Sequence, residues 1–322
     1  MTNSKEYIRR INSEIEKIKI SGEPDELYKP IQYILNLKSK RVRPILSMMG
    51  YRLFDNKIEK IYKPSVAIEF FHNFTLIHDD IMDNASLRRG NETIHNKWNK
   101  NIGVLSGDLL MIFAFKMLED IDNGNLKEIL KRFNDIAIKV CEGQQYDMNF
   151  ESEKDISESD YLNMIKLKTA VLIGFSLELG GLIANQKKEI TNKLYRAGEL
   201  MGIAFQLMDD HLDVFGNEKF GKKIGGDIIS NKKTYMMIKL LEEASGDDLH
   251  HIKKWVKTND KEEEKIKIIT GLLKKYNIDL KSEKLTNKYF SEGMNILNDI
   301  RSDKNQMNHL KSYFENLLIR NN

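Results

Sequence analysis

Apolar residues recur at spacings of three and four along almost the whole chain, which is the periodicity of helices that bury one face. Near the N-terminus, Tyr7, Ile11 and Ile15 form such a stripe. The sequence has only four prolines and no Val/Thr-rich alternating segment of the kind that predicts strands. With 322 residues, 41% of them hydrophobic, it is long enough to bury a large core. The pattern predicts an all-α protein folded as a single domain over residues 1–322.

The predicted helices are separated by short polar stretches. Pro44 is placed in the first turn of one helix, a position that proline tolerates. Further helices are expected from about residue 64 to the aspartates at 79–83, and over 104–120, 127–147, 159–184 and 188–215. Residues 84–91 are expected to form a loop, and residues 216–231, which hold four glycines, a mobile one that could serve as a lid.

One acidic pattern, two adjacent aspartates followed two residues later by a third, occurs twice. The copies are Asp79-Asp80-Ile81-Met82-Asp83 and Asp209-Asp210-His211-Leu212-Asp213, called here the first and second acidic motifs. Each ends an apolar helical run. On a helix, the first and last aspartate of such a motif project from one face, one turn apart. Two such faces turned toward each other would present carboxylates suited to Mg²⁺ ions that bridge a pyrophosphate.

A single acidic cluster on a helix is usually solvated surface, so the apolar setting of both copies matters. Two carboxylates about 5 Å apart repel by about 1 kcal/mol in water and by about 3 kcal/mol at an effective dielectric near 20. A half-buried face tolerates that repulsion only when a cation is present. The paired motifs therefore predict diphosphate chemistry with divalent metal.

Basic residues accompany both motifs. Arg88 and Arg89 follow the first motif, and arginine can donate two parallel hydrogen bonds to a phosphate. Two adjacent arginines are also common in ordinary charged loops, and a lysine in mid-helix, such as Lys168, is more often surface than ligand. Lys222 and Lys232 follow the second motif. Together these cations could neutralise two pyrophosphates, one through metal and one through Lys, Arg and His alone.

Several motifs occur in an order that resembles one known family. They are Lys40-Arg41-Val42-Arg43-Pro44, Glu69-Phe70-Phe71-His72, Leu76-Ile77-His78-Asp79-Asp80, Arg88-Arg89-Gly90, Gly107-Asp108, Lys168-Thr169-Ala170, Phe205-Gln206-Leu207-Met208-Asp209-Asp210, and the loop with Gly221, Lys222, Gly225 and Asp227. Over about residues 38–235 the chain resembles the trans-isoprenyl diphosphate synthases, or polyprenyl synthetases. Two positions depart from the family pattern: Lys38-Ser39 replaces a Gly-Gly pair, and Asn231 replaces the glycine of a late Gly-Lys-x-Thr element.

The resemblance implies about a dozen helices around a central catalytic cavity, usually in a homodimer. It also implies a short-chain enzyme that joins isopentenyl diphosphate to an allylic diphosphate (dimethylallyl, geranyl or farnesyl). Three Mg²⁺ ions would bind Asp79, Asp83 and Asp209 directly, with Asp80, Asp210 and Asp213 supporting them. The allylic diphosphate would contact Arg88, Lys168, Lys222 and Lys232. Isopentenyl diphosphate would contact Lys40, Arg43, His72 and Arg89. Thr169 and Gln206 would line the reacting carbons, and Phe205 would flank the isopentenyl group.

Product length in this family depends on the residues four, five and eight positions before the first aspartate. Here they are Thr75, Phe74 and Phe71, although phenylalanines at helical spacing are usually ordinary core residues. With Phe74 as the floor, both farnesyl and geranylgeranyl diphosphate are possible products. Phe71 favours the shorter product, but the small Thr75 favours geranylgeranyl diphosphate, which is the expected main product, with farnesyl diphosphate as the alternative.

Two other functions fit parts of the pattern. A terpene cyclase usually keeps one acidic motif and needs no second basic site, but both are present here. A non-catalytic subunit that modulates a synthase typically loses aspartates or arginines from these motifs, and none is lost here. An assay of the purified protein alone separates an enzyme from such a subunit.

Charge and hydropathy restrict the partners. The net charge of +3 results from 31% charged residues of both signs, which are interleaved, so no nucleic-acid face is expected. Neither a signal-peptide core nor an apolar run long enough to span a membrane stands out. These features predict a cytoplasmic protein.

Overall fold

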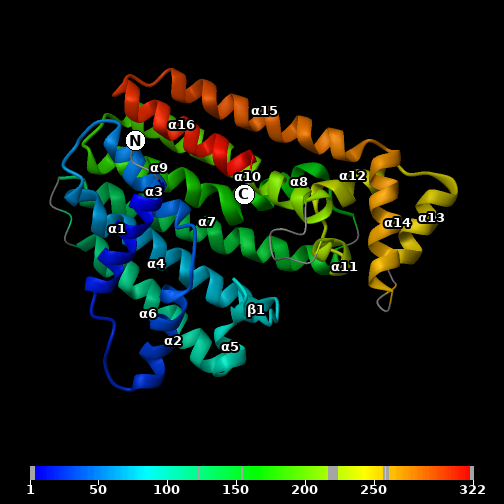
Figure 1. Cartoon of the computed structure of the whole chain (residues 1–322), viewed down its shortest axis with the longest axis horizontal. Helices are drawn as coiled ribbons and strands as arrows, with labels where there is room; N and C mark the ends of the chain where they lie inside the picture. Colours follow the sequence, from blue (N-terminus) through cyan, green and yellow to red (C-terminus); the bar gives the residue numbers. More distant parts are fainter. Residues whose placement is uncertain are drawn as a thin grey trace. The chain divides into compact units, whose positions relative to one another are not determined.

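The structure is a computed structural model that describes residues 4–119, 121, 124–153, 155–216, 224–256, 258 and 261–319. Over these residues it is helical almost throughout, with a single short hairpin (Figure 1). The all-α prediction is confirmed.

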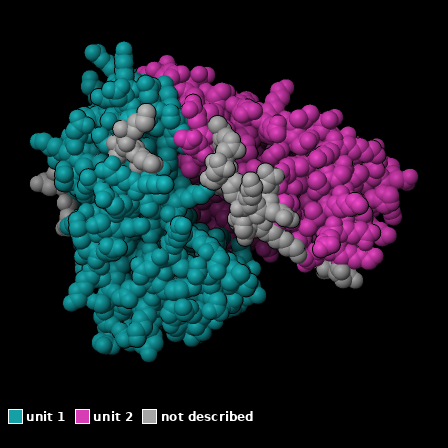
Figure 2. Space-filling view, viewed as in Figure 1, with its two compact units in different colours: residues 1–135, 175–195, 300–313 teal, residues 136–174, 196–299, 314–322 magenta. Residues whose placement is uncertain are grey.

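The chain divides into two compact units (Figure 2). Unit 1 comprises Met1–Asp135, Phe175–Tyr195 and Ile300–Tyr313, and unit 2 comprises Ile136–Gly174, Arg196–Asp299 and Phe314–Asn322. A single domain over residues 1–322 stays a prediction.

Unit 1 contains the first acidic motif. Its elements are α1 (Ser4–Lys17), α2 (Asp25–Asn36), α3 (Val42–Arg52), α4 (Glu59–Met82), β1 (Leu87–Arg88), β2 (Asn91–Glu92), α5 (Ile94–Lys97) and α6 (Lys100–Glu119). The strands pair antiparallel, with Leu87 opposite Glu92. The hairpin lies in the segment expected to be a loop, and it presents Arg88 and Arg89 just after the motif.

Unit 2 contains the second acidic motif. Its elements are α8 (Glu158–Ile165), the π-helix η1 (Lys166–Ala170), α11 (Gly226–Ile229), α12 (Tyr235–Glu243), α13 (Gly246–Val256), α14 (Glu262–Lys275) and α15 (Ile278–Asn298). Four further helices have residues in both units: α7 (Leu126–Ser152), α9 (Val171–Ile183), α10 (Lys188–Phe215) and α16 (Lys304–Ile319). Ser157 begins α8 with a capping box, in which its side chain and that of Asp160 bond each other's backbone N–H.

The close packing of α4 on α6 positions the first acidic motif. A Cβ atom on Gly107 of α6 would lie 2.4 Å from Nε2 of His78, and one on Gly103 would lie 2.8 Å from Ile81. Both glycines therefore allow α6 to approach the last turns of α4. The imidazole of His78 is fixed there by a 3.1 Å contact of Nε2 with the carbonyl oxygen of Val104. This packing orients the residue that immediately precedes Asp79.

The second acidic motif lies on α10, whose bounds agree with the prediction of 188–215. Nearby, residues expected in one continuous helix over 159–184 instead include the π-turn η1. A Cβ atom on Gly143 of α7 would lie only 2.2 Å from the backbone nitrogen of Lys168, so α7 packs directly against the η1 backbone. Single π-turns are frequent at functional sites, and this one carries Lys168 and Thr169.

Three further local expectations need correction. The helix expected from residue 64 begins earlier, at Glu59, with Pro64 inside it. The loop expected over 216–231 contains the helix α11, and residues 217–223 of that segment, including Lys222, lie outside the described residues. Helix α6 is long and apolar enough to cross a membrane by length and composition, although no such run stood out in the sequence. Because α6 packs extensively on α4, this is weak support for a span.

Candidate active site

The first acidic motif ends α4, and its three aspartates have different surroundings. Asp79 is half-buried in the last turn, Asp83 is the exposed C-cap residue, and Asp80 is buried with 2% of its surface exposed. The backbone N–H of Asp83 donates to the carbonyl oxygen of Asp79 at 2.8 Å, so the two residues stay one turn apart. The helix end thus carries one exposed carboxylate, one half-buried carboxylate and a third that points inward.

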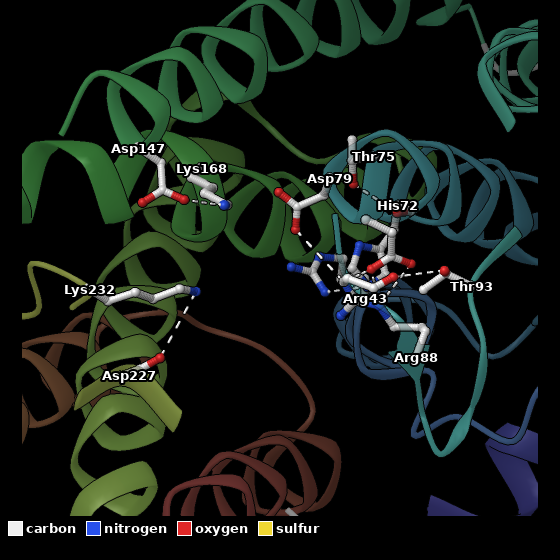
Figure 3. A network of polar contacts seen from close by, with 12 residues as sticks. Arg43, His72, Thr75, Asp79, Arg88, Thr93, Asp147, Lys168, Asp227 and Lys232 are labelled. Carbon is white, nitrogen blue, oxygen red and sulfur yellow. Dashed lines mark hydrogen bonds and ion pairs between the residues drawn. The ribbon is translucent and has the colours of Figure 1, made fainter. Parts of the chain in front are cut away.

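Arg88, presented by β1, neutralises the inward carboxylate. Its Nε donates to Oδ1 and Oδ2 of Asp80 at 2.9 and 3.2 Å, and its Nη2 also bonds Oδ1. Nη2 lies 3.9 Å from Oδ2 of Asp79 (Figure 3). Burial raises the pKa of Asp80, and the hydrogen bonds and charge of Arg88 oppose that rise. Asp80 is therefore bonded to Arg88, and its predicted role in supporting the metal ligands stays a prediction.

Three predicted isopentenyl diphosphate ligands come together in unit 1. Arg43 in the first turn of α3 donates from Nη1 to Nε2 of His72 on α4 at 3.0 Å (Figure 3). Arg89 lies in the hairpin turn in a left-handed conformation, with φ of 54°. Burial, followed by the charges of Arg43 and Arg89, holds the pKa of His72 well below its usual range. Lys40, the fourth predicted ligand, is exposed on the turn just before α3.

These three residues, Arg43, His72 and Arg89, are called here the basic cluster, and their electrostatics favour an anion. Burial and the neighbouring charges of Arg41 and Arg88 also lower the pKa of Arg89, against the opposing carboxylates of Glu69 and Asp80. Among the described residues, Nη1 of Arg89 is buried without a hydrogen-bond acceptor. Positive charge gathered at a partly buried position is stabilised by an anion, and planar guanidinium groups suit phosphate oxygens.

A buried ion pair that sequence reasoning missed supports the basic cluster. Arg41, in a left-handed conformation with φ of 47°, donates from Nη1 to Oε1 of Glu69 at 2.6 Å. Its Nε donates to Asn12 at 3.1 Å and its Nη2 to the carbonyl oxygen of Leu35 at 2.5 Å. The sequence feature that could have indicated this ion pair is the single glutamate, Glu69, within the apolar run of α4. Fully bonded, this pair fixes the turn that leads into Arg43.

The predicted chain-length residues lie together on α4. Phe71 is fully buried and Phe74 is 8% exposed, and their ring centroids are 5.6 Å apart. Phe71 also packs edge-on against Phe133 of α7 at 5.1 Å. Phe74 contacts the ring of His78 at 4.8 Å, one turn closer to the acidic motif. Thr75 is half-buried, and its hydroxyl donates to the carbonyl oxygen of His72 at 2.8 Å.

In the second acidic motif the middle aspartate is again buried, but its partners carry no charge. Asp210 accepts from the hydroxyl of Tyr161 and, at 2.9 Å, from Nε2 of Gln206. Burial, followed by the charge of Asp227, raises the pKa of Asp210 to about 7, against the hydrogen bonds of Tyr161 and Gln206. Tyr161 was not predicted as a site residue, because its place in an apolar helical stripe gives no sign of a polar partner.

A hydrogen-bonded chain fixes the residues predicted to line the reacting carbons. The hydroxyl of Thr169 donates to Oε1 of Gln206 at 3.2 Å, and the amide of Gln206 donates onward to Asp210. The hydroxyl hydrogen of Thr169 is thus engaged, so its oxygen offers lone pairs to other groups. Phe205 precedes Gln206 on α10 and is half-buried.

Two predicted cations of unit 2, Lys168 and Lys232, have carboxylate partners. Nζ of Lys168 lies 2.5 Å from Oδ2 of Asp147 on α7, and Nζ of Lys232 lies 4.0 Å from Oδ1 of Asp227 (Figure 3). Asp147 was missed because the pair joins two different helices, with α8 between them in the sequence. Asp213 accepts at 2.9 Å from the backbone N–H of Asp227. It therefore caps α11 as well as belonging to the motif.

The predicted metal ligands are divided between the units, with Asp79 and Asp83 in unit 1 and Asp209 in unit 2. Within the described part of the chain, no group of three or more His, Cys, Asp or Glu side chains is arranged to hold a metal ion. Mg²⁺ usually takes only one or two protein carboxylates and completes its shell with water and substrate phosphate. A pair of carboxylates one turn apart on a helix therefore fits Mg²⁺.

Comparison with known proteins agrees with these features. Residues 24–273 match the family described as Polyprenyl synthetase. Geranylgeranyl diphosphate synthase of Sulfolobus acidocaldarius is 34% identical over 98% of this chain and 96% of that protein. The crystal structure of geranylgeranyl pyrophosphate synthetase from Pyrococcus horikoshii superposes with a TM-score of 0.93 at 28% identity, covering 99% of this chain and 97% of that one. Another geranylgeranyl pyrophosphate synthase structure covers both chains fully with a TM-score of 0.94 at 37% identity. The chain therefore belongs to the polyprenyl synthetase family.

Proposed function

We propose that this protein is a prenyltransferase that joins isopentenyl diphosphate head to tail to allylic diphosphates, with geranylgeranyl diphosphate as its main product. The main supporting observation is that the single helix α4 contributes both to the basic cluster and to the first acidic motif. His72 lies within the basic cluster, and Asp79 begins the carboxylate motif further along the same helix. One diphosphate would bind through cations alone, and the other through metal.

The basic cluster would hold isopentenyl diphosphate. Because Nε2 of His72 accepts from Arg43, the neutral imidazole carries its proton on Nδ1 and can donate there. The buried Nη1 of Arg89 supplies a further donor. A diphosphate in this position would raise the pKa of His72 from its lowered value, since its negative charge offsets the surrounding guanidinium groups, whereas the effect of burial would remain.

The allylic diphosphate would bind at the acidic motifs. Asp79, Asp83 and Asp209 would hold Mg²⁺, three ions as the family resemblance implies, which acts as a Lewis acid toward the leaving diphosphate. Lys168, Lys232 and Arg88 would add positive charge where the leaving group develops negative charge. Lys168 would have to exchange its bond with Asp147 for the substrate. Lys222 would act with them, and it lies outside the described residues.

The reaction breaks the allylic C–O bond and leaves a carbocation and pyrophosphate. The double bond of isopentenyl diphosphate then supplies the electron pair of the new C–C bond, and loss of a proton to the released pyrophosphate forms the new double bond. The lone pairs of the Thr169 oxygen, whose hydrogen is held by Gln206, would stabilise the cation without donating a proton to it. Phe71 and Phe74 would give the growing chain an apolar wall.

The ring pair Phe71–Phe74 supports a short-chain product. Phe74 is the less buried of the two and lies nearer the acidic motif, so it would form the floor that a growing chain reaches first. Relatives named geranylgeranyl diphosphate synthases share 34–36% identity with this chain. Farnesyl diphosphate is the alternative product.

We also propose that the protein works as a cytoplasmic homodimer. Helix α6 exposes Leu105 and Ile112 by 58% and 61%, and these residues share one helical face with Val104, which is 41% exposed. A second copy covering this face would explain why only 39% of the most apolar stretch of this helix is buried. Light scattering coupled to size exclusion should give a dimer, and the Ile112→Lys variant a monomer. Co-sedimentation with liposomes would instead favour a membrane-bound protein.

The proposed activity is tested with the purified protein and labelled isopentenyl diphosphate. Dimethylallyl, geranyl and farnesyl diphosphate are offered in turn as the primer, with Mg²⁺ or with excess chelator, and products are identified by mass spectrometry. A prenyl diphosphate should form only with Mg²⁺. Calorimetric titration of Mg²⁺ in the presence of pyrophosphate, compared with the Asp79→Ala variant, tests the metal site independently of turnover. A cyclic hydrocarbon product, or no product without a partner protein, would reject the proposal.

A further inference from the structure

The short helix α11 carries Asp227 and leads directly into Lys232, and a buried lysine from another helix contacts its end. Lys265 of α14 is 2% exposed. Its Nζ donates to Oδ1 of Asn231 at 2.7 Å, to the carbonyl oxygen of Ile229 at 3.2 Å and to that of Thr258 at 3.4 Å. These three acceptors use all three donors of the ammonium group. A lysine this buried is unusual. Two of its acceptors, on Ile229 and Asn231, belong to the end of α11, and the third, on Thr258, precedes α14.

The turn that Lys265 contacts is a Schellman motif. The backbone N–H of Lys232 donates to the carbonyl oxygen of Asp227 at 2.9 Å, and that of Asn231 to the carbonyl oxygen of Ile228 at 3.2 Å. Asn231 has a left-handed backbone with φ of 56°, as the residue after such a helix end requires. Glycine is the usual residue there, and asparagine is the next most tolerant.

The bond from Lys265 is specific to asparagine at this position. A glycine, which the family pattern places here, has no side chain to accept the 2.7 Å bond from Nζ. Asn231 and Lys265 therefore act as a pair: the asparagine adopts a backbone conformation that it tolerates less well than glycine, and the ammonium group holds its amide. The positive charge also lies at the C-terminal end of α11, where it interacts favourably with the helix dipole.

The opposite end of α11 is held by the second acidic motif. Oδ2 of Asp213 accepts from the backbone N–H of Asp227 at 2.9 Å, and the carbonyl oxygen of Asp213 accepts from Gly225 at 2.7 Å. Gly225 has φ of 80°, and a Cβ atom there would lie 2.7 Å from Ile266 of α14. The four-residue helix is thus fixed between a carboxylate at its start and an ammonium group at its end.

We propose that Lys265 is a positioning residue for the allylic diphosphate site. By holding Asn231 and the end of α11, it sets the direction in which the next residue, Lys232, leaves the turn. This inference rests on the proposed function, because Lys232 is assigned there to the allylic diphosphate. Lys265 itself contacts no substrate, and its effect reaches the site through the backbone of residues 229–232.

The test is the Lys265→Met variant, which keeps the aliphatic stem and removes the ammonium group. The Michaelis constant for geranyl diphosphate should rise about tenfold, the size typical of lost supporting contacts at a binding site, while that for isopentenyl diphosphate stays within about twofold. Lys267→Met removes an exposed lysine from the same helix and should change neither constant. A general loss of folding would instead affect both substrates alike.

A second variant tests the pairing. Asn231→Gly should be nearly neutral, and in its background Lys265→Met should raise the constant for geranyl diphosphate by less than about threefold, because glycine needs no side-chain partner. If Lys265→Met does not fold, Asn231→Ala, which keeps the lysine but loses its acceptor, should show the same selectivity for geranyl diphosphate. Equal effects on both substrates, or none, would overturn the role of Lys265. An inactive parent protein would instead reject the proposed function.

Discussion

The two acidic motifs share one pattern in the sequence but differ in how the structure balances the buried middle carboxylate. Asp80 in unit 1 is held by the charged guanidinium of Arg88. Asp210 in unit 2 is held by two uncharged donors, Tyr161 and Gln206. Burial raises both pKa values, and that of Asp210 reaches about 7. Two motifs with the same spacing of aspartates can therefore differ in the protonation of the middle carboxylate, and the partners that decide this lie outside the motifs.

The largest expected effect tests whether the motifs are functionally equivalent despite this difference. Asp79→Ala and Asp209→Ala should each lower kcat/KM by about 10³-fold, the order found when a group that stabilises transition-state charge is removed. Steady-state kinetics with geranyl diphosphate measure both variants. Asp247→Ala, which removes an exposed aspartate from α13, should leave the rate unchanged. If only one of the two variants lost activity, only that motif would bind a metal ion that the reaction requires.

The next prediction compares how much the charged partner of Asp80 and an uncharged partner of Asp210 contribute to the free energy of unfolding. Arg88→Met leaves the carboxylate of Asp80 buried without its counter-ion, which should lower the free energy of unfolding by about 3–5 kcal/mol at pH 7. Tyr161→Phe removes one neutral hydrogen bond from Asp210 and should cost only about 1–3 kcal/mol. Urea denaturation of the metal-free protein measures both. Equal losses would mean that the two motifs are balanced in the same way.

Because the pKa of Asp210 is raised to about 7, the free energy of unfolding should depend on pH more strongly through the second acidic motif than through the first. The folded protein keeps the proton of Asp210 up to pH about 7, whereas the unfolded chain releases it near 3.8, so stability from this group falls as the pH rises between these values. In chelator, the free energy of unfolding of the Asp210→Asn variant should therefore fall less steeply from pH 4 to pH 7 than that of the parent protein. Parallel curves would mean that Asp210 is already ionised throughout.

Local patterns in the sequence were enough to predict much of the fold. Both ends of α10 agree with the prediction, because its apolar repeat is long and regular. The π-turn η1 was missed, since it depends on the close approach of α7 at Gly143, a contact distant in sequence. Of the four residues that the family resemblance implied for isopentenyl diphosphate, Arg43, His72 and Arg89 form the basic cluster within unit 1, whereas Lys40 is exposed before α3, and their roles stay predictions. Tyr161 and Lys265 were missed because their partners come from other helices.

The smallest effect in free energy concerns a further difference between the motif-bearing helices. Five residues before the first aspartate stands Phe74 on α4 but Ala204 on α10, so only α4 offers a bulky floor for the product. Phe74→Ala should lengthen the main product by one or more isoprene units. A change of about 1.4 kcal/mol between release and further elongation shifts the product ratio tenfold.

Phe70→Ala is the matched control, because Phe70 is equally large but packs against Phe113 of α6 instead. Mass spectrometry of the products decides the matter. If Phe74→Ala keeps the parent product while Phe70→Ala alters it, the floor lies on the face of α4 toward α6.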